Sequence, residues 1–155
     1  MSRHSFSEIK RFIRFDKKSE RVSRVKRDRF IMIPAVWDKF IENCQSCYIP
    51  GQNLTVDEQL FPTKARYPFT QYTASKPDKF GIKFWLIVDV DSKYLLNAFL
   101  YLGKDDFRPT NVSVSTHVVL KLAEPLLDEG RAITMDDTYF TNISLAQRLL
   151  QRKTL

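Results

Sequence analysis

Two short segments of the sequence alternate apolar and polar residues and then reach an acid. These acids are the first candidates for chemistry. Residues 54–59 read Leu-Thr-Val-Asp-Glu-Gln, and residues 133–137 read Ile-Thr-Met-Asp-Asp. Side chains of a β-strand alternate between its two faces. We therefore expect the apolar residues of both segments to face a core. Asp57 and Asp136 are expected to project from the opposite face, where each strand ends.

Asp57 and Asp136 converge if the two strands lie side by side. Neighbouring strands are about 4.8 Å apart, and two carboxylates brought that close repel each other unless a cation lies between them. We interpret the pair as two ligands of a divalent metal site. The alternative is a pair of ordinary strand-ending acids, which is the simpler interpretation of either residue taken alone.

The charge of the chain is concentrated near its start. The 155 residues suit one domain, or one domain and a fragment of another. The formal net charge of +7 comes from residues 1–30, where 11 Lys and Arg outnumber 4 Asp and Glu, since the remaining residues are balanced. This basic segment favours a polyanionic partner. The alternative is a solvated basic arm without a partner.

No segment is typical of a membrane span or of a signal peptide. The longest run without a charge, residues 43–56, is polar and contains Pro50 and Gly51. No apolar stretch follows Met1. Two cysteines without a disulfide framework are typical of a reducing compartment, so we expect an intracellular protein.

Cys44 and Cys47 have the spacing of a C-x-x-C motif. A zinc or redox site of this kind needs further ligands, but there is no second cysteine pair and the only histidines are His4 and His117. We therefore expect two semi-buried thiols at the end of a helix.

The apolar periodicity and the turn residues predict an alternation of helices and strands. Ser5 and Glu8 have the spacing of a capping box, whereas the charge-dense residues 16–30 lack periodicity and are expected to form a linker. Helices are expected over 5–15, from Pro34 to before Pro50, over 115–127 with Ser115 as the cap, and after Asn142 as a second cap; strands are expected over 53–60, 80–90, 94–102 and in the second acid segment.

The connections between these strands predict an α/β protein with a mixed sheet. The first three strands are joined without helices and should be antiparallel, whereas the fourth follows a helix and can pair in parallel through a right-handed crossover. Residues 80–90 carry apolar side chains on both faces, which indicates a strand covered on both sides. Pairing the fourth strand with the first is the arrangement that brings Asp57 and Asp136 together. Asp89 and Asp91 are interpreted as turn acids.

Basic and aromatic residues are interleaved between the first two strands, in a stretch over 61–79 that three prolines predict to be irregular. Such a mixture can grip a phosphate backbone and stack on bases. The alternative is that the aromatic rings pack this loop onto the body. The residues concerned are Lys64, Arg66, Lys76 and Lys79 with Tyr67, Phe69 and Tyr72; Arg11 and Arg14 project from the first helix.

A set of short motifs runs nearly end to end through the chain. They are Met1-Ser2-Arg3 with Phe6, Arg14-Phe15-Asp16, Val36-Trp37-Asp38, Tyr48-Ile49-Pro50-Gly51, residues 54–59, Ser75-Lys76-Pro77, Phe80-Gly81-Ile82-Lys83, Leu96-Asn97-Ala98, Tyr101-Leu102-Gly103 and residues 133–136. With these motifs the sequence resembles the piggyBac-type transposases, whose catalytic core has a ribonuclease-H-like fold. The resemblance implies a basic helical segment over 1–48 and an incomplete catalytic core over 49–155.

The resemblance also implies an activity and a set of site residues. Asp57 and Asp136 would be the first and second of three catalytic aspartates that hold two divalent ions, Mg²⁺ or Mn²⁺. Such ions, about 3.5–4 Å apart, support in-line displacement at phosphorus. The substrate would be DNA, which would be cut and joined at transposon ends and TTAA targets in the nucleus. The resemblance leaves open whether the protein acts as a homodimer. The residues that would position the phosphate backbone are Lys64, Arg66, Lys76, Lys79 and Lys83.

The sequence departs from the family pattern in three places. The third aspartate of the family lies on a later helix, beyond these 155 residues, so the chain is expected to be inactive alone. Because the Met1-Ser2-Arg3 segment is usually internal in the family, the chain looks truncated at both ends. Residues 64–69 replace a Gly-Arg-Cys-Pro-Phe-like run, and Asp137 adds an acid beside Asp136. The alternatives are a domesticated, catalytically inactive DNA-binding module and a non-functional remnant with an incomplete fold.

Overall fold

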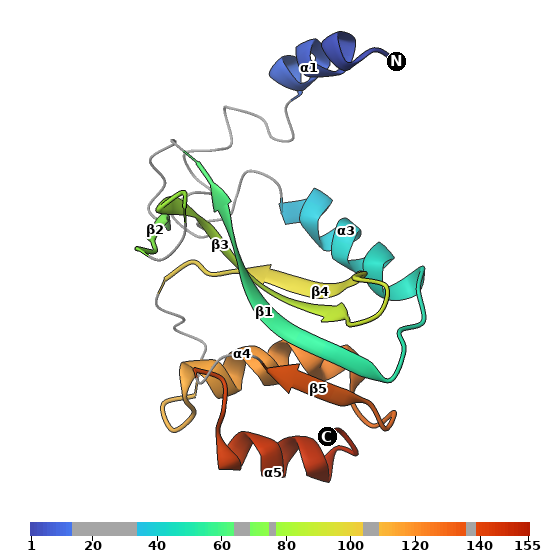
Figure 1. Ribbon diagram of the computed structural model, residues 1–155, viewed down its shortest axis with the longest axis vertical. Coiled ribbons are helices and arrows are strands. Elements are labelled where there is room, and N and C mark those ends of the chain that lie inside the picture. The colour runs from blue at the N-terminus through green and yellow to red at the C-terminus, as the bar shows by residue number, and fades with distance from the viewer. Residues whose placement is uncertain (14–33, 64–68, 75–76, 104–108, 136–138) are drawn as a thin grey trace. The chain divides into compact units, whose positions relative to one another are not determined.

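The computed structural model describes residues 1–13, 34–63, 69–74, 77–103, 109–135 and 139–155 (Figure 1). The linker expected over 16–30 lies outside these residues. The chain divides into two compact units, Met1–Phe40 and Ile41–Leu155. No helix in the described ranges is both long enough and apolar enough to cross a membrane.

The first unit contains helix α1 (Arg3–Phe12), which begins and ends earlier than predicted. Ser2, rather than Ser5, is its cap: the Ser2 side chain accepts a hydrogen bond from the Ser5 backbone N–H at 3.1 Å. Glu8 does not complete a capping box, because its carboxylate accepts from Arg11 one turn later. Helix α3 (Pro34–Ser46) starts at the predicted proline and ends before Pro50, as expected.

The second unit is built on a mixed sheet (Figure 1). Strand β1 (Asn53–Pro62) lies between β3 (Phe80–Asp89), which is antiparallel to it, and β5 (Ala132–Met135), which is parallel to it. Strand β4 (Leu95–Leu100) pairs antiparallel with the other edge of β3. The predicted order and directions of these four strands are therefore confirmed. A short additional strand, β2 (Gln71–Tyr72), pairs with the start of β3 inside the stretch predicted to be irregular.

Three helical segments complete this unit. Helix α4 (Val114–Ala123) is capped by Ser113, which accepts from the Thr116 N–H at 3.2 Å, and not by Ser115 as predicted. The predicted end near Leu127 was also too late, because the chain tightens into a 3₁₀ turn over Glu124–Leu126 at its proline. The predicted cap of the last helix, α5 (Ile143–Gln151), is confirmed: Asn142 accepts from the Ser144 N–H at 2.8 Å.

The core of this unit lies against one face of the sheet. Leu54 and Val56 of β1 are 0% and 2% exposed, and they pack with the odd-numbered residues of β3. The even-numbered residues 82–88 of β3 are only half-buried, so the expectation that both faces of this strand are covered holds in part. The remaining buried core residues come mainly from the helices: Val118, Val119, Leu122 and Ala123 of α4, and Leu145 and Leu149 of α5.

Gly81 allows β3 to approach the end of β1. A Cβ atom built on Gly81 would lie 2.8 Å from Leu60 Cγ and 2.9 Å from the carbonyl carbon of Phe61, and closer still to the Phe61 oxygen. Most of these neighbours are backbone atoms held in the β1–β3 pairing, so they cannot move aside without breaking it. The glycine of the Gly-Ile-Lys motif is therefore required by strand packing.

We expect Gly81→Ala to destabilise the fold by about 1–3 kcal/mol, the usual cost of overpacking. The matched control is Gly130→Asn. Gly130 has φ +74° and nothing within 4 Å of an added Cβ, and asparagine tolerates this left-handed conformation, so the control should cost at most about 1 kcal/mol. Denaturant unfolding measures both values. Equal losses in the two variants would contradict the packing explanation.

Candidate active site

Asp57 projects from the face opposite the core, as expected, but it lies in the middle of β1 and not where the strand ends, because β1 continues to Pro62. Leu54 and Val56 are buried, Thr55 is half-buried and Asp57 is exposed, which is the alternation predicted from the sequence. The carboxylate accepts one hydrogen bond, from the Glu58 backbone N–H at 2.6 Å. Within the described residues, the remaining carboxylate lone pairs are open to a ligand.

Strand β5 brings the second acid segment next to the first. Leu54 pairs with Ile133, Thr55 with Thr134 and Val56 with Met135. Like its partner Leu54, Ile133 is buried, whereas Thr134 is exposed. The residues that immediately precede Asp57 and Asp136 are thus neighbours on adjacent strands. Asp136 itself lies outside the described residues, as does Asp137, so the meeting of the two carboxylates stays a prediction.

The carboxylate oxygens of Asp57 and Asp136 are chemically suited to a divalent cation that prefers oxygen ligands. Carboxylate oxygens are the ligands that Mg²⁺ and Mn²⁺ select over softer donors. The described residues supply one such ligand at this place, Asp57, and they contain no cluster of three or more His, Cys, Asp or Glu side chains. A second carboxylate at this place would have to come from outside the described residues, where Asp136 and Asp137 lie.

Lys83, predicted to contact phosphate, is engaged inside the second unit. Its ammonium forms an ion pair with Glu58 and lies 3.9 Å from the centroid of the Trp85 ring. The Lys83 and Glu58 side chains are only 19% and 27% exposed. The β1–β3 register places both residues on the core face, opposite Asp57. The sequence predicted the position of Lys83 in a strand but gave no signal for this pairing.

The other predicted DNA-contacting residues are placed in three ways. Lys79 is exposed in the turn before β3, where its carbonyl accepts from the Thr73 N–H. Arg11 is exposed on α1, in the first unit, and pairs with Glu8 at 3.1 Å. Those outside the described residues are Arg14, Lys64, Arg66 and Lys76.

Comparison with known proteins agrees with the motifs and the strand order. The family described as Transposase IS4 matches residues 1–155, the whole chain. The chain belongs to this transposase family. It is also similar to a solved structure described as a cryo-EM structure of the piggyBac transposase synaptic complex with hairpin DNA, with a TM-score of 0.86 and 38% sequence identity. The match covers 99% of this chain but only 32% of that one. The mixed sheet is consistent with a ribonuclease-H-like core.

Asp89 of the transposase chain closes a turn, as predicted. The side chain is buried, and its two oxygens accept hydrogen bonds from the Gly51, Asp91 and Ser92 backbone N–H groups and from the Ser92 hydroxyl, at 2.7–3.1 Å. The bonds from Ser92 and Gly51 hold the pKa of this carboxyl below its ordinary value of 3.8. Asp89 is therefore a structural acid that joins the entry of β1 to the β3–β4 turn.

Both cysteines of the transposase chain are free, but they differ in exposure. Cys44 is buried, whereas Cys47 is exposed and not semi-buried as predicted. Burial, and then the neighbouring Cys47, raises the pKa of the Cys44 thiol. A raised pKa lowers the thiolate fraction, so Cys44 is poorly suited to nucleophilic or redox chemistry.

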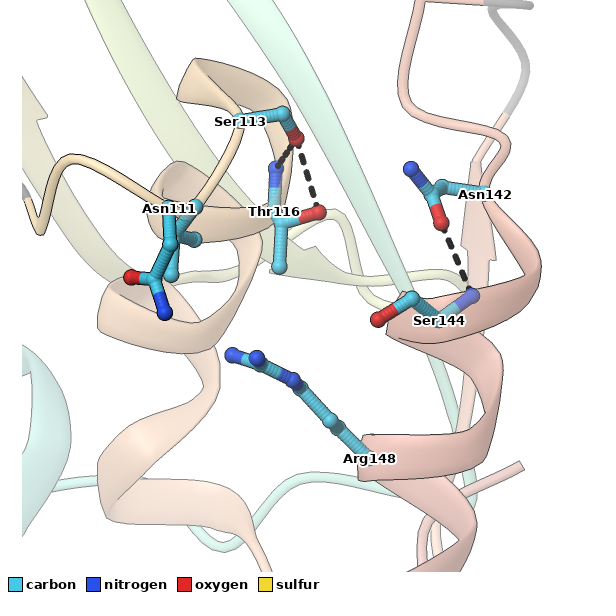
Figure 2. A pocket seen from close by; sticks show the side chains of 7 residues that line it. Asn111, Ser113, Thr116, Asn142, Ser144 and Arg148 are labelled. Atoms are coloured by element: carbon cyan, nitrogen blue, oxygen red, sulfur yellow. Dashed lines mark hydrogen bonds between the residues drawn. The ribbon is translucent and has the colours of Figure 1, made fainter.

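A polar cavity of about 240 Å³ lies between the N-terminal ends of α4 and α5 (Figure 2). The oxygens of Ser113 and Asn142 are used there as helix caps, and Arg148 extends its guanidinium into the space between the two ends. Among the described residues, the lining of this cavity includes neither Asp57 nor any other site residue predicted from the sequence. Its lining comprises Asn111, Val112, Ser113, Thr116, Asn142, Ser144 and Arg148.

The hydrogen bonds to Asp89 predict a specific pH dependence of stability. A lowered folded-state pKa means that Asp89 stabilises the transposase chain above about pH 3.8, and that this stabilisation is lost as the pH falls through the lowered value. Asp89→Asn should therefore lower the melting temperature at neutral pH, with the gap to wild type narrowing below about pH 3.8. Thermal unfolding across this range tests it, with the exposed Asp91→Asn as control. A gap that is constant with pH would contradict the assignment.

The Glu58–Lys83 pair predicts an energetic coupling inside the fold. A double-mutant cycle with Glu58→Gln and Lys83→Met should give a coupling of roughly 0.5–3 kcal/mol, because the two groups are in contact and largely removed from water. The matched control is the Asp128–Arg152 pair, with side chains 50% and 52% exposed, for which Asp128→Asn and Arg152→Gln should couple less strongly. Urea unfolding measures both cycles; a larger coupling in the control pair would be inconsistent with this account.

Proposed function

We propose that this chain forms part of the catalytic core of a piggyBac-type DNA transposase and contributes Asp57 and Asp136 to its metal site. Two observations support the proposal. The family matches the whole chain, and the parallel β1–β5 register pairs Val56 with Met135, the residues directly before the two acids. The register is the observation that carries the proposal, because it gives two acids 79 residues apart in the sequence a reason to meet.

In this proposal Asp57 and Asp136 would hold divalent ions, Mg²⁺ or Mn²⁺. Bound ions of this kind activate an attacking oxygen and stabilise the leaving oxygen in a displacement at phosphorus. The chain itself supplies the negative charge and the rigid placement. The burial of Leu54 and Val56 fixes the direction of the Asp57 side chain, and pairing on both edges prevents β1 from shifting.

The proposed substrate is DNA at transposon ends, with cutting and joining at TTAA targets in the nucleus. The solved relative was determined as a synaptic complex with hairpin DNA, and the basic excess in residues 1–30 favours a polyanion here too. Lys79, which is exposed in the β2–β3 turn, would contact the phosphate backbone, as would Lys64, Arg66 and Lys76. A homodimer would be in keeping with a synaptic complex.

The proposal is tested first by metal binding, which does not require the rest of a longer transposase. Asp57→Asn and Asp136→Asn should each weaken Mn²⁺ binding by more than about tenfold, because an amide carries no negative charge. Removing a residue that only hydrogen-bonds to a metal ligand already lowers metal affinity about tenfold, so removing the ligand itself should lower it further. Electron paramagnetic resonance of free Mn²⁺ gives the affinity. Asp91→Asn, an exposed acid in a turn, is the matched control and should bind Mn²⁺ as wild type does.

The same variants separate the enzyme from its alternative. If Asp57→Asn and Asp91→Asn weaken Mn²⁺ binding equally, the acids act only as surface charge and the metal site is disproved. A chain that binds hairpin DNA equally well with and without Mg²⁺, and whose carboxylate variants bind Mn²⁺ as wild type does, would instead support the catalytically inactive DNA-binding module.

A further inference from the structure

Three aromatic side chains of the second unit are exposed beside one another near the end of β1. Phe61, Tyr72 and Phe80 are 54%, 58% and 58% exposed, although large aromatic residues normally bury most of their surface. The Tyr72 and Phe80 rings lie 5.0 Å apart, and the Phe61 ring lies 5.2 Å from Phe84 in an edge-on contact. We call Phe61, Tyr72 and Phe80 the aromatic platform.

The strand register places the aromatic platform on the same face of the sheet as Asp57. Asp57 and Phe61 are four residues apart on β1, so their side chains leave the strand in the same direction. Their partners across the β1–β3 pairing are Leu86 and Ile82, and Phe80 continues that alternation along β3. Tyr72 pairs directly with Phe80. The platform and the candidate metal ligand therefore belong to one surface, away from the core.

The spacing suits a nucleic-acid strand that lies along β1. Four residues of strand cover about 13 Å, and successive phosphates of one strand of duplex DNA are about 3.4 Å apart along the axis. The bases at the platform would thus lie within about four nucleotides of a phosphate bound beside Asp57, and fewer where the unpaired strand is more extended than in a duplex. Figure 1 shows this end of β1 running to β2 and the start of β3.

The chemistry of the platform favours unpaired bases over an apolar protein partner. Exposed aromatic rings on a sheet offer flat faces on which unpaired bases stack, whereas bases inside a duplex already stack on each other. Lys79, in the turn directly before Phe80, is exposed and adds a positive charge at this end of β3. An apolar protein interface does not require a cation at this position.

We infer that the aromatic platform binds unpaired nucleobases of the DNA strand whose phosphate would be bound by the ions at Asp57. This inference rests on the proposed function and narrows its substrate to DNA with unpaired nucleotides near the reacting phosphate. Phe69, one of the aromatic residues first considered for stacking, is buried and takes no part.

The test compares two DNA probes that share a stem: a hairpin with an unpaired loop that carries 2-aminopurine, and a blunt duplex. Replacing Tyr72 and Phe80 together by leucine should weaken hairpin binding by about fivefold to 100-fold, because stacking is lost. Duplex binding should change by less than about twofold. The matched control, Tyr72→Phe with Phe80→Tyr, keeps both rings and should keep the hairpin affinity. Phe61→Leu removes the third ring of the platform and should also weaken binding of the hairpin more than binding of the duplex.

Three further readouts decide between outcomes. Binding should quench 2-aminopurine fluorescence with wild type and with the ring-preserving variant, but not with the leucine variant. The three proteins should have equal melting temperatures, which shows that the leucine variant is folded. Equal losses for hairpin and duplex, or no binding of either probe by wild type, would overturn the inference. So would a wild-type dimer that the leucine variant dissociates without DNA, because the patch would then be a protein contact.

Success or failure of this inference is separable from that of the proposed function. Asp57→Asn should weaken Mn²⁺ binding by more than about tenfold, whereas replacing Tyr72 and Phe80 by leucine should leave Mn²⁺ binding as in wild type. If Mn²⁺ binding responds as proposed while the leucine variant keeps its hairpin preference, the platform is disproved and the metal site stands. If the leucine variant loses the preference but no carboxylate substitution affects Mn²⁺, the metal site fails and base stacking stands.

Discussion

The structure of the second unit depends on one strand that is hydrogen-bonded on both edges and has two unlike faces. β1 pairs with β3 on one side and β5 on the other, while Leu54 and Val56 anchor one face in the core. A shift of one residue in either pairing would turn these side chains into water and Asp57 into the core. The free energy of burying the apolar residues therefore also sets the direction in which Asp57 projects.

The start of β1 is held by contacts from segments far apart in the sequence. The Gly51 N–H donates to Asp89 at 2.7 Å, and the Gly51 carbonyl accepts from Arg131 Nε at 3.3 Å. The Ala132 N–H donates to the Gln52 carbonyl at 2.8 Å. The proline–glycine motif before β1 thus links the β3–β4 turn to the beginning of β5. This arrangement gives a physical reason for that motif, since added bulk at Gly51 would crowd the Asp89 carboxylate.

Much of this arrangement could be predicted from the sequence, because local alternation and capping carry direct physical signals. The alternation in 54–57 predicted the two faces of β1, and the helix between the third and fourth strands predicted the parallel pairing. Other features depend on contacts that sequence spacing does not encode. The choice of Ser113 over Ser115 as a cap depends on where α4 meets the sheet, and the Glu58–Lys83 pair depends on the β1–β3 register. Strand β2 is too short to show a period.

The pairing of Lys83 with Glu58 changes what the number of basic residues in this chain means for binding a polyanion. Salt sensitivity of such binding arises when cationic groups release counterions condensed on phosphates, with the logarithmic slope falling by about 0.9 for each phosphate neutralised on duplex DNA. Lys83 already has Glu58 as its counterion and an aromatic ring beneath it. It displaces no ion from a phosphate. The count of 25 Lys and Arg residues therefore overstates how steeply salt would weaken the binding of this molecule to a nucleic acid.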